Sequence, residues 1–222
     1  EEKNMKIQNK IIGDGKSVFV IAEIGMNHNG KYDNAIKLID LAYEAGADCV
    51  KFQMRDLKSL YSEDALNLSS SDLSTQYTLG LLKKFELNYD EFKNIYQYTR
   101  NKGIIFMCTP WDIISADKID SLGTPGFKIA SADLTNLELI NHVITKNKPI
   151  ILSTGMSTQE EIDITVSFLE KNNAEYALLH CNSTYPAPFK DINLNYLNKL
   201  KSYNIPFGYS GHERGIAVSL AA

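Results

Sequence analysis

The sequence predicts an α/β fold built on parallel strands, and two observations lead to this class. Short, continuous apolar runs recur along the chain, and stretches with helical periodicity separate them. This alternation is typical of parallel strands that are buried on both faces. Each apolar run also carries, or ends in, a polar residue able to do chemistry, as in a ring of strands that presents reactive groups at one mouth. We therefore expect a (β/α)8 TIM barrel. An open doubly wound sheet is the alternative, because it also places ligands at the carboxyl ends of strands.

The elements are expected in the following order. A β-hairpin should come first, with strands at 6–8 and 17–19 around a turn at 13–15. Helices should end before Gly46 and Gly103, and one should start after the N-cap pair Ser157 and Thr158. The strands are predicted at 18–24, 48–54, 104–108, 126–130, 150–152, 176–179 and 207–211, and the helices at 33–45, 89–102, 111–122, 137–146, 159–172 and 194–203.

Seven β units can be counted, and a closed barrel needs eight. We therefore expect a barrel truncated after its seventh unit, with residues 215–222 starting a further helix. Residues 55–88 are the longest irregular stretch and predict a lid or substrate loop, with a short helix around 75–85. No linker or low-complexity segment divides the chain, so residues 1–222 are taken as one domain.

Composition narrows the class of protein. The chain has 222 residues, of which 44% are hydrophobic and 23% charged, as is ordinary for a soluble globular protein. A net charge of −4 argues against a nucleic-acid partner. No signal-peptide core is found, and no apolar run reaches the roughly 18 residues of a membrane span. Cys49, Cys108 and Cys181 lie in or beside predicted strands, which favours reduced, buried thiols and a cytoplasmic location.

Two lysines stand out because Lys51 and Lys128 lie inside apolar strands. An unpaired ammonium there would be costly, so each lysine should be paired or should face a polar cavity. At a barrel mouth such a lysine can bind phosphate or carboxylate. The alternative is a structural ion pair with Glu23, itself either an acid or base or merely a counter-ion.

Hydroxyl groups lie at the ends of several strands, at Thr109, Ser131, Ser153 and Ser210. Each alone is more often a helix N-cap than a ligand contact. As a set around the two lysines they predict a site for an anion.

His212 follows Ser210 by two residues, so both side chains should point to the same side of a strand. Neutral imidazole is a good ligand for a divalent metal, although a metal site needs further ligands. His28 and His180 are the other candidates, and His180 could equally be a core histidine.

Six segments together resemble the sialic acid synthase family, which includes N-acetylneuraminate, legionaminate and pseudaminate synthases. They occur in the family's order, and the resemblance runs from about residue 6 to residue 222. The segments are AEIGMNHNG (22–30), VKFQ (50–53), FKIAS (127–131), LSTGM (152–156), LHCNSTYP (179–186) and GYSGHE (208–213).

The resemblance implies a TIM barrel that condenses phosphoenolpyruvate with an N-acetylated aminosugar aldehyde, giving a nonulosonic (sialic-type) acid and phosphate. It also implies a divalent metal, commonly Mn²⁺ with Mg²⁺ or Co²⁺ as alternatives, and a homodimer in the full-length protein. Carried over by motif, the catalytic residues are Glu23, Lys51 and Lys128, and the metal ligand is His212. The substrate-binding residues carried over in the same way are Gln53, Thr109, Ser131, Ser153, Ser183, Tyr185 and Ser210.

Two features of the family lie outside residues 1–222: a second metal histidine in the eighth strand, and a C-terminal antifreeze-like domain that lends an arginine to the partner subunit's site. We therefore expect a half-built metal site here and little turnover from these residues alone. Two other functions stay open. One is a Schiff-base aldolase that uses Lys51 or Lys128; the other is a non-catalytic domain that binds a sugar or phosphate.

Overall fold

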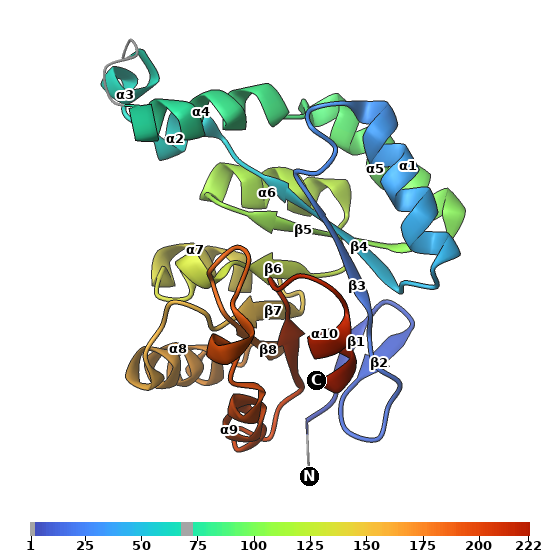
Figure 1. The fold of residues 1–222 in the computed structure, drawn as a ribbon, viewed down its shortest axis with the longest axis vertical. Helices are drawn as coiled ribbons and strands as arrows, with labels where there is room; N and C mark the ends of the chain where they lie inside the picture. Colours follow the sequence, from blue (N-terminus) through green and yellow to red (C-terminus); the bar gives the residue numbers. More distant parts are fainter. Residues whose placement is uncertain (1–2, 68–72) are drawn as a thin grey trace. The chain divides into compact units, whose positions relative to one another are not determined.

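Parallel strands form the centre of each of the two units into which the chain divides. The computed structural model describes residues 3–67 and 73–222. Unit 1 contains residues up to Val18 and Gly126–Ala222, and unit 2 contains Phe19–Pro125. Figure 1 shows their elements. Residues 68–72 of the expected lid loop lie outside the described residues.

Unit 2 contains a sheet in the order β3-β4-β5, with every neighbouring pair parallel. The strands are β3 (Ile21–Gly25), β4 (Cys49–Met54) and β5 (Ile105–Pro110). The register places Glu23 opposite Lys51 and Gln53 opposite Thr109. Three of the expected strands are thus confirmed, and their polar residues come together at the carboxyl end of this sheet.

The helices of unit 2 largely follow the prediction, because their end signals are local. Asn88 and Glu91 form a capping box, and Gly103 ends α5 with a left-handed φ of +82°. The helix expected at 111–122 begins two residues later, because the Asp112 side chain accepts from the Ser115 amide as an N-cap. The unit 2 helices are α1 (Tyr32–Glu44), α2 (Leu57–Leu60), α3 (Glu63–Asn67), α4 (Leu73–Phe85), α5 (Tyr89–Lys102) and α6 (Ile113–Leu122).

The stretch 55–88 is more regular than the sequence indicates. It contains α2 and α3 as well as α4, so the expectation of an irregular loop is wrong at 57–60 and 63–67. The helix expected at 75–85 is confirmed and starts earlier, at Leu73. The helices α2 and α3 have only 4 and 5 residues, which is too short for an apolar periodicity to show in the sequence.

Unit 1 contains four parallel strands in the order β6-β7-β8-β9. Cys181 lies opposite Ser210 in this register. The helix α8 starts at a capping box formed by Thr158 and Glu161, as expected. The strands are β6 (Phe127–Ile129), β7 (Ile150–Ser153), β8 (Tyr176–Cys181) and β9 (Phe207–Ser210); the helices are η1 (Ser131–Asp133), α7 (Leu137–Ile144), α8 (Gln159–Lys171), η2 (Phe189–Asp191), η3 (Leu194–Tyr196), α9 (Leu197–Lys201) and α10 (Ala217–Ala221).

The N-terminal hairpin is confirmed, but its predicted turn and second strand are wrong. β1 (Met5–Ile7) pairs antiparallel with β2 (Lys10–Ile12), so the chain reverses at Gln8 and Asn9. Gln8 adopts a φ of +52°, in the left-handed region that tight hairpin turns use. The glycines at 13–15, which suggested the turn, follow the second strand instead. No helix in the described part of the chain is long and apolar enough to cross a membrane.

Candidate functional site

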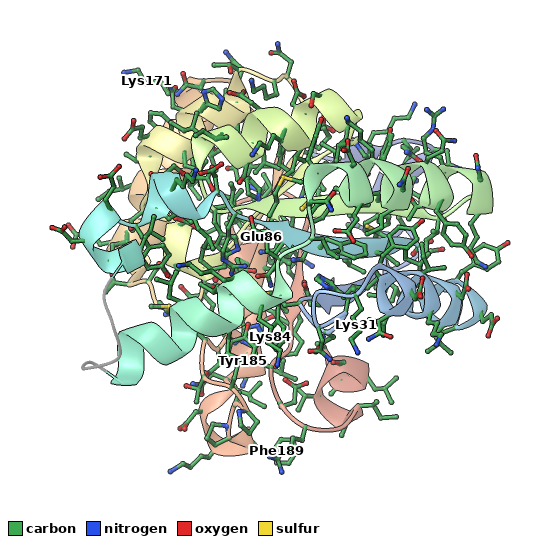
Figure 2. The ribbon with its side chains drawn as sticks, turned by 90° about the horizontal axis from the view of Figure 1, so that it is seen from above. Lys31, Lys84, Glu86, Lys171, Tyr185 and Phe189 are labelled. Atoms are coloured by element: carbon green, nitrogen blue, oxygen red, sulfur yellow. The ribbon has the colours of Figure 1, made fainter. Side chains whose placement is uncertain are left out.

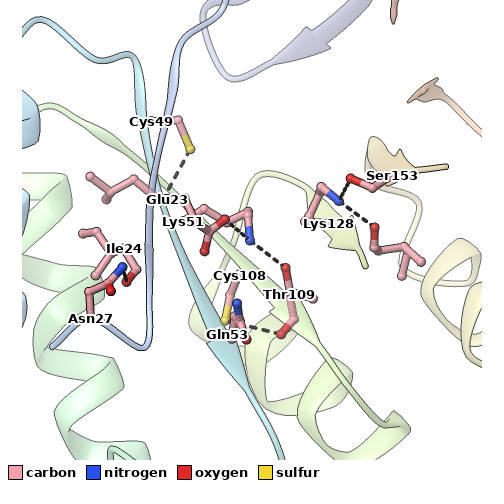
Figure 3. A network of polar contacts seen from close by, with 12 residues as sticks. Glu23, Ile24, Asn27, Cys49, Lys51, Gln53, Cys108, Thr109, Lys128 and Ser153 are labelled. Carbon is pink, nitrogen blue, oxygen red and sulfur yellow. Dashed lines mark hydrogen bonds and ion pairs between the residues drawn. The ribbon is translucent and has the colours of Figure 1, made fainter. Parts of the chain in front are cut away.

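The buried lysine of unit 1 lies among hydroxyl groups at the ends of β6 and β7. Lys128 is 5% exposed, and its Nζ donates to Ser153 Oγ at 2.5 Å and to the Ile129 carbonyl at 2.7 Å (Figure 3). Lys128 is the middle residue of β6 and Ser153 is the last residue of β7, so the parallel pairing of these strands brings them together. The ammonium is desolvated and hydrogen-bonded, as a group that binds an anion should be.

Two further hydroxyls converge on Gly155, just beyond β7. The Gly155 amide donates to Ser131 Oγ at 3.2 Å. A Cβ at Gly155 would lie 2.4 Å from Ser183 Oγ and 2.8 Å from Ser131 Oγ, so only glycine leaves room for both. Within the described residues, Ser183 Oγ is buried and makes no hydrogen bond of normal geometry. Such a hydroxyl is costly unless a ligand satisfies it. We call Lys128, Ser131, Ser153, Gly155 and Ser183 the anion cradle.

Cys181 lies beside the anion cradle, and sequence reasoning missed this position. Its thiol faces the hydroxyls of Ser131, Ser210 and Ser183, and burial raises the pKa of the thiol. The three cysteines are buried free thiols, as the sequence predicts. The position of Cys181 in the sequence could have indicated it. Cys181 is the last residue of β8 and lies opposite Ser210, so it is at the carboxyl end of the strands, where the site was expected.

His212 is held by both ring nitrogens. Nδ1 lies 2.5 Å from the Asn182 carbonyl and Nε2 lies 2.6 Å from the Tyr185 hydroxyl, while the Tyr185 ring stacks on the imidazole with centroids 3.8 Å apart. A carbonyl only accepts, so Nδ1 carries a proton, and in the neutral ring Nε2 accepts from Tyr185. A carbonyl that orients Nδ1 is the usual support of a metal-binding histidine.

His212 therefore fits as one ligand of a metal ion, but it does not make a complete metal site. Among residues 3–67 and 73–222, no three His, Cys, Asp or Glu side chains come together as a metal cluster. The other histidines have local partners. His180 Nε2 lies 2.6 Å from the Ile192 carbonyl, as in a satisfied core histidine. His28 Nδ1 accepts from the Gly30 amide, and burial lowers the pKa of the ring.

Lys51, the buried lysine of unit 2, forms an ion pair with Glu23. This pair was the alternative interpretation of Lys51 from the sequence. The Lys51 Nζ lies 2.5 Å from Glu23 Oε2 and donates to Thr109 Oγ1 at 3.0 Å (Figure 3). The Lys51 side chain is 8% exposed, whereas that of Glu23 is 48% exposed. The carboxylate is thus anchored by a buried cation but remains accessible to a substrate or to water.

Gln53 lies on the same face of β4 as Lys51, and Arg55 continues that face. Gln53 Oε1 accepts from Arg55 Nη2 at 2.9 Å, and the guanidinium lies 4.2 Å from the centroid of the Trp111 ring. Sequence reasoning missed Arg55. The alternation of Lys51, Gln53 and Arg55 could have indicated this residue, because side chains two residues apart lie on the same face of a strand.

Comparison with known proteins identifies the family of this chain. A model of the NeuB family matches residues 38–222. The N,N'-diacetyllegionaminic acid synthase of Campylobacter jejuni is 40% identical over 217 residues, which cover 93% of this chain and 64% of that protein. An uncharacterised protein of Methanocaldococcus jannaschii is 42% identical over 216 residues, covering 96% of this chain and 61% of its own length. The chain thus spans about three fifths of the length of these relatives.

A solved structure supports the same assignment. The N-acetylneuraminic acid (sialic acid) synthetase of Leptospira borgpetersenii, solved with citrate, is 31% identical with a TM-score of 0.89, over 99% of this chain and 74% of that one. This likeness confirms the expected barrel-type α/β fold class, with its N-terminal hairpin. The family match covers well over half of the chain, and it confirms the resemblance seen in the six segments. The chain belongs to the NeuB family.

Proposed function

We propose that this chain carries the substrate-binding and catalytic residues of a synthase that condenses phosphoenolpyruvate with an N-acetylated aminosugar aldehyde. The products are a nonulosonic acid and phosphate. The anion cradle is the observation that carries this proposal, because it combines a buried ammonium with hydroxyls that have spare hydrogen-bonding capacity. Membership of a family whose relatives include N,N'-diacetyllegionaminic acid synthase supports it.

Phosphoenolpyruvate suits the anion cradle chemically. It carries a carboxylate and a phosphate, and a buried ammonium with hydroxyl donors binds such groups by charge-assisted hydrogen bonds. We assign this role to Lys128, Ser131, Ser153 and Ser183, with Ser210 beside them through its contact with Cys181.

The unit 2 residues take the proton-handling and sugar-binding roles in this proposal. Lys51, which also donates to Thr109, holds Glu23 in place, and the half-exposed carboxylate can accept a proton from water. Gln53 takes the sugar-binding role in unit 2, and we assign the same role to Tyr185 of unit 1.

The proposed reaction forms one C–C bond and breaks the C–O bond between C2 and phosphate. C3 of the enol attacks the aldehyde carbon, a C–C bond forms, and the aldehyde oxygen becomes a hydroxyl by taking up a proton. Water adds at C2 and gives up a proton, for which Glu23 is the base. The C2–O bond to phosphate then breaks while the new C2 hydroxyl gives up its proton to the leaving phosphate, which leaves the keto acid and inorganic phosphate.

We also propose that His212 Nε2 is one ligand of a divalent metal, Mn²⁺ in the first instance. When bound, such an ion polarises the aldehyde as a Lewis acid. Tyr185 would have to release Nε2 for the metal, since the two groups are in contact. A homodimer and a cytoplasmic location belong to the same proposal; the three buried free thiols support the location.

The Schiff-base aldolase is less well supported. Lys51 Nζ is engaged by a carboxylate and a hydroxyl, and Lys128 Nζ by a hydroxyl and a carbonyl, so attack on a carbonyl would require breaking two contacts in either case. Trapping with borohydride and a keto acid separates the two mechanisms, since the synthase forms no covalent adduct.

The test is phosphate release from phosphoenolpyruvate by the full-length protein, with Mn²⁺ and a panel of N-acetylated aminosugars. We expect release that depends on both the metal and one sugar, and its loss in Lys128→Met. Lys171→Met is the matched control, because Lys171 lies exposed at the end of α8 (Figure 2). Sugar-independent release, or equal activity in both variants, would contradict the proposal.

A further inference from the structure

His212 lies just beyond the end of its strand, in a bend that the sheet itself does not hold. In the described part of the chain, β9 ends at Ser210, and its pairing with β8 ends with Cys181 opposite Ser210. The His212 carbonyl accepts from the amide of Ala187, in the loop after β8, at 3.1 Å. The position of this histidine therefore depends on contacts made outside the strand ladder.

A hydrogen bond spans the bend that carries His212. The Tyr209 hydroxyl donates to Glu213 Oε2 at 2.7 Å, which joins the last residue but one of β9 to the residue that follows His212. A hydrogen bond to a carboxylate is charge-assisted and is roughly twice as strong as one between neutral groups. Oε1 of the same carboxylate accepts from Ser219 Oγ of α10 at 3.4 Å. We call Tyr209 and Glu213 the clamp.

Gly211 leaves the space in which the clamp forms. A Cβ at Gly211 would lie 2.9 Å from both oxygens of the Glu213 carboxylate and 3.0 Å from Cε1 of the Tyr209 ring. The clamp thus lies directly over the backbone of the residue that precedes His212. A side chain at this position would push the carboxylate aside and break the hydrogen bond to Tyr209.

The Tyr209 ring is itself held in place, so it can serve as the fixed side of the clamp. Tyr209 lies opposite His180 in the register of β8 and β9, and the centroids of the two rings are 6.0 Å apart. His180 is anchored in turn by its contact with the Ile192 carbonyl. The clamp therefore connects Glu213 to a ring that the sheet and His180 keep in position.

We propose that the clamp positions His212 for the divalent metal. This inference rests on the proposal that His212 Nε2 is a metal ligand, and it adds the residues that set the position of that ligand. Glu213 acts through the backbone of the bend, because its two oxygens are engaged by Tyr209 and Ser219. A histidine whose backbone is already fixed loses less conformational freedom on binding, so metal affinity should depend on the clamp.

The test is the dissociation constant of Mn²⁺ for the full-length protein, stripped of metal and measured by electron paramagnetic resonance without substrates. Glu213→Ala and Tyr209→Phe should each raise this constant about tenfold, at the lower end of the effect of removing a group that orients a metal ligand. The double variant should bind about as weakly as either single variant, because both remove the same hydrogen bond. Glu213→Gln keeps an acceptor oxygen for the Tyr209 hydroxyl and should retain most of the wild-type affinity.

Tyr196→Phe is the matched control. The Tyr196 hydroxyl also donates to a side chain, that of Gln159, and the Tyr196 ring also packs on His180. Its replacement removes a comparable hydrogen bond in the same unit without touching the bend, so Mn²⁺ affinity should stay unchanged. Tyr209→Phe keeps the packing of its ring and serves if Glu213→Ala does not fold.

Several results would overturn the clamp and leave the metal proposal standing. One is wild-type Mn²⁺ affinity in both Glu213→Ala and Tyr209→Phe, and another is an equal loss in the control variant. A loss in Glu213→Gln as large as that in Glu213→Ala would also overturn it, since Glu213 would then act through its charge. If His212→Ala bound Mn²⁺ as tightly as the wild type, the metal proposal would fail, and the clamp with it.

Discussion

Replacing Gly155 by alanine tests the anion cradle directly. The new Cβ would lie 2.4 Å from Ser183 Oγ, 2.8 Å from Ser131 Oγ and 3.0 Å from the Cys181 carbonyl oxygen. The two hydroxyls can rotate away, but the carbonyl belongs to the backbone of β8 and can shift only a little. Overpacking of this kind costs about 1–3 kcal/mol. For a protein of this size the melting temperature should fall by roughly 2–12 °C.

The same substitution should also weaken phosphoenolpyruvate binding. The methyl group displaces the Ser131 and Ser183 hydroxyls from the positions in which they face a ligand. Losing one charge-assisted hydrogen bond costs about 1.5–3 kcal/mol, so affinity should fall at least about tenfold. Thermal unfolding followed by circular dichroism gives the stability change, and isothermal titration with phosphoenolpyruvate gives the affinity.

Gly80→Ala is the control, because it is the same substitution in α4 with no atom within 4 Å of the new Cβ. It should be neutral or stabilising by up to about 1 kcal/mol, as alanine favours a helix over glycine. Ser183→Ala in the Gly155→Ala background removes the closest contact and should restore part of the stability. Wild-type stability and affinity in Gly155→Ala, or purely additive losses in the double variant, would refute the cradle geometry.

Three further predictions concern stability. Glu23→Gln should lower the free energy of unfolding by about 1–3 kcal/mol, which is more than Lys51→Met should lower it in thermal unfolding. Glu23→Gln leaves a buried ammonium without its carboxylate, whereas Lys51→Met leaves a half-exposed carboxylate that water can hydrate. The reverse order would contradict this. Burial lowers the pKa of His28 in the folded protein, so below about pH 6.5 the unfolded chain binds a proton at this ring more readily than the folded protein does. The free energy of unfolding should therefore decline as pH falls below about 6.5. In His28→Gln the slope of melting temperature against pH should be shallower between about pH 7 and about pH 5, and an unchanged slope would sink this reasoning. Thr158→Ala removes the capping box with Glu161 and should cost about 1 kcal/mol, measured by urea unfolding; no change would show that the cap contributes nothing to stability.

Much of the fold was predictable because its signals are local. Strand positions follow from apolar runs, and helix ends follow from caps such as Thr158 and Gly103, which depend only on residues a few positions away. The prediction of the hairpin turn was wrong because it, too, relied on local signals. The glycines at 13–15 are good turn residues, but Met5 and Ile7 pair with β2 through a tight turn at Gln8 and Asn9, which the sequence signals weakly.

By itself, the sequence determined the order of strands and helices and which residues lie at strand ends, because side-chain direction alternates with a period of two. It could not say that Lys51 pairs with Glu23, that Ser131 and Ser183 converge on Gly155, or that Gln53 presents its amide nitrogen as a donor. The first two depend on strand register and on contacts between residues far apart in the sequence, and the third depends on the position that the Arg55 side chain takes; local propensity encodes none of them. Only the tertiary structure decides them, since each hydrogen bond forms where packing has already brought the two groups together.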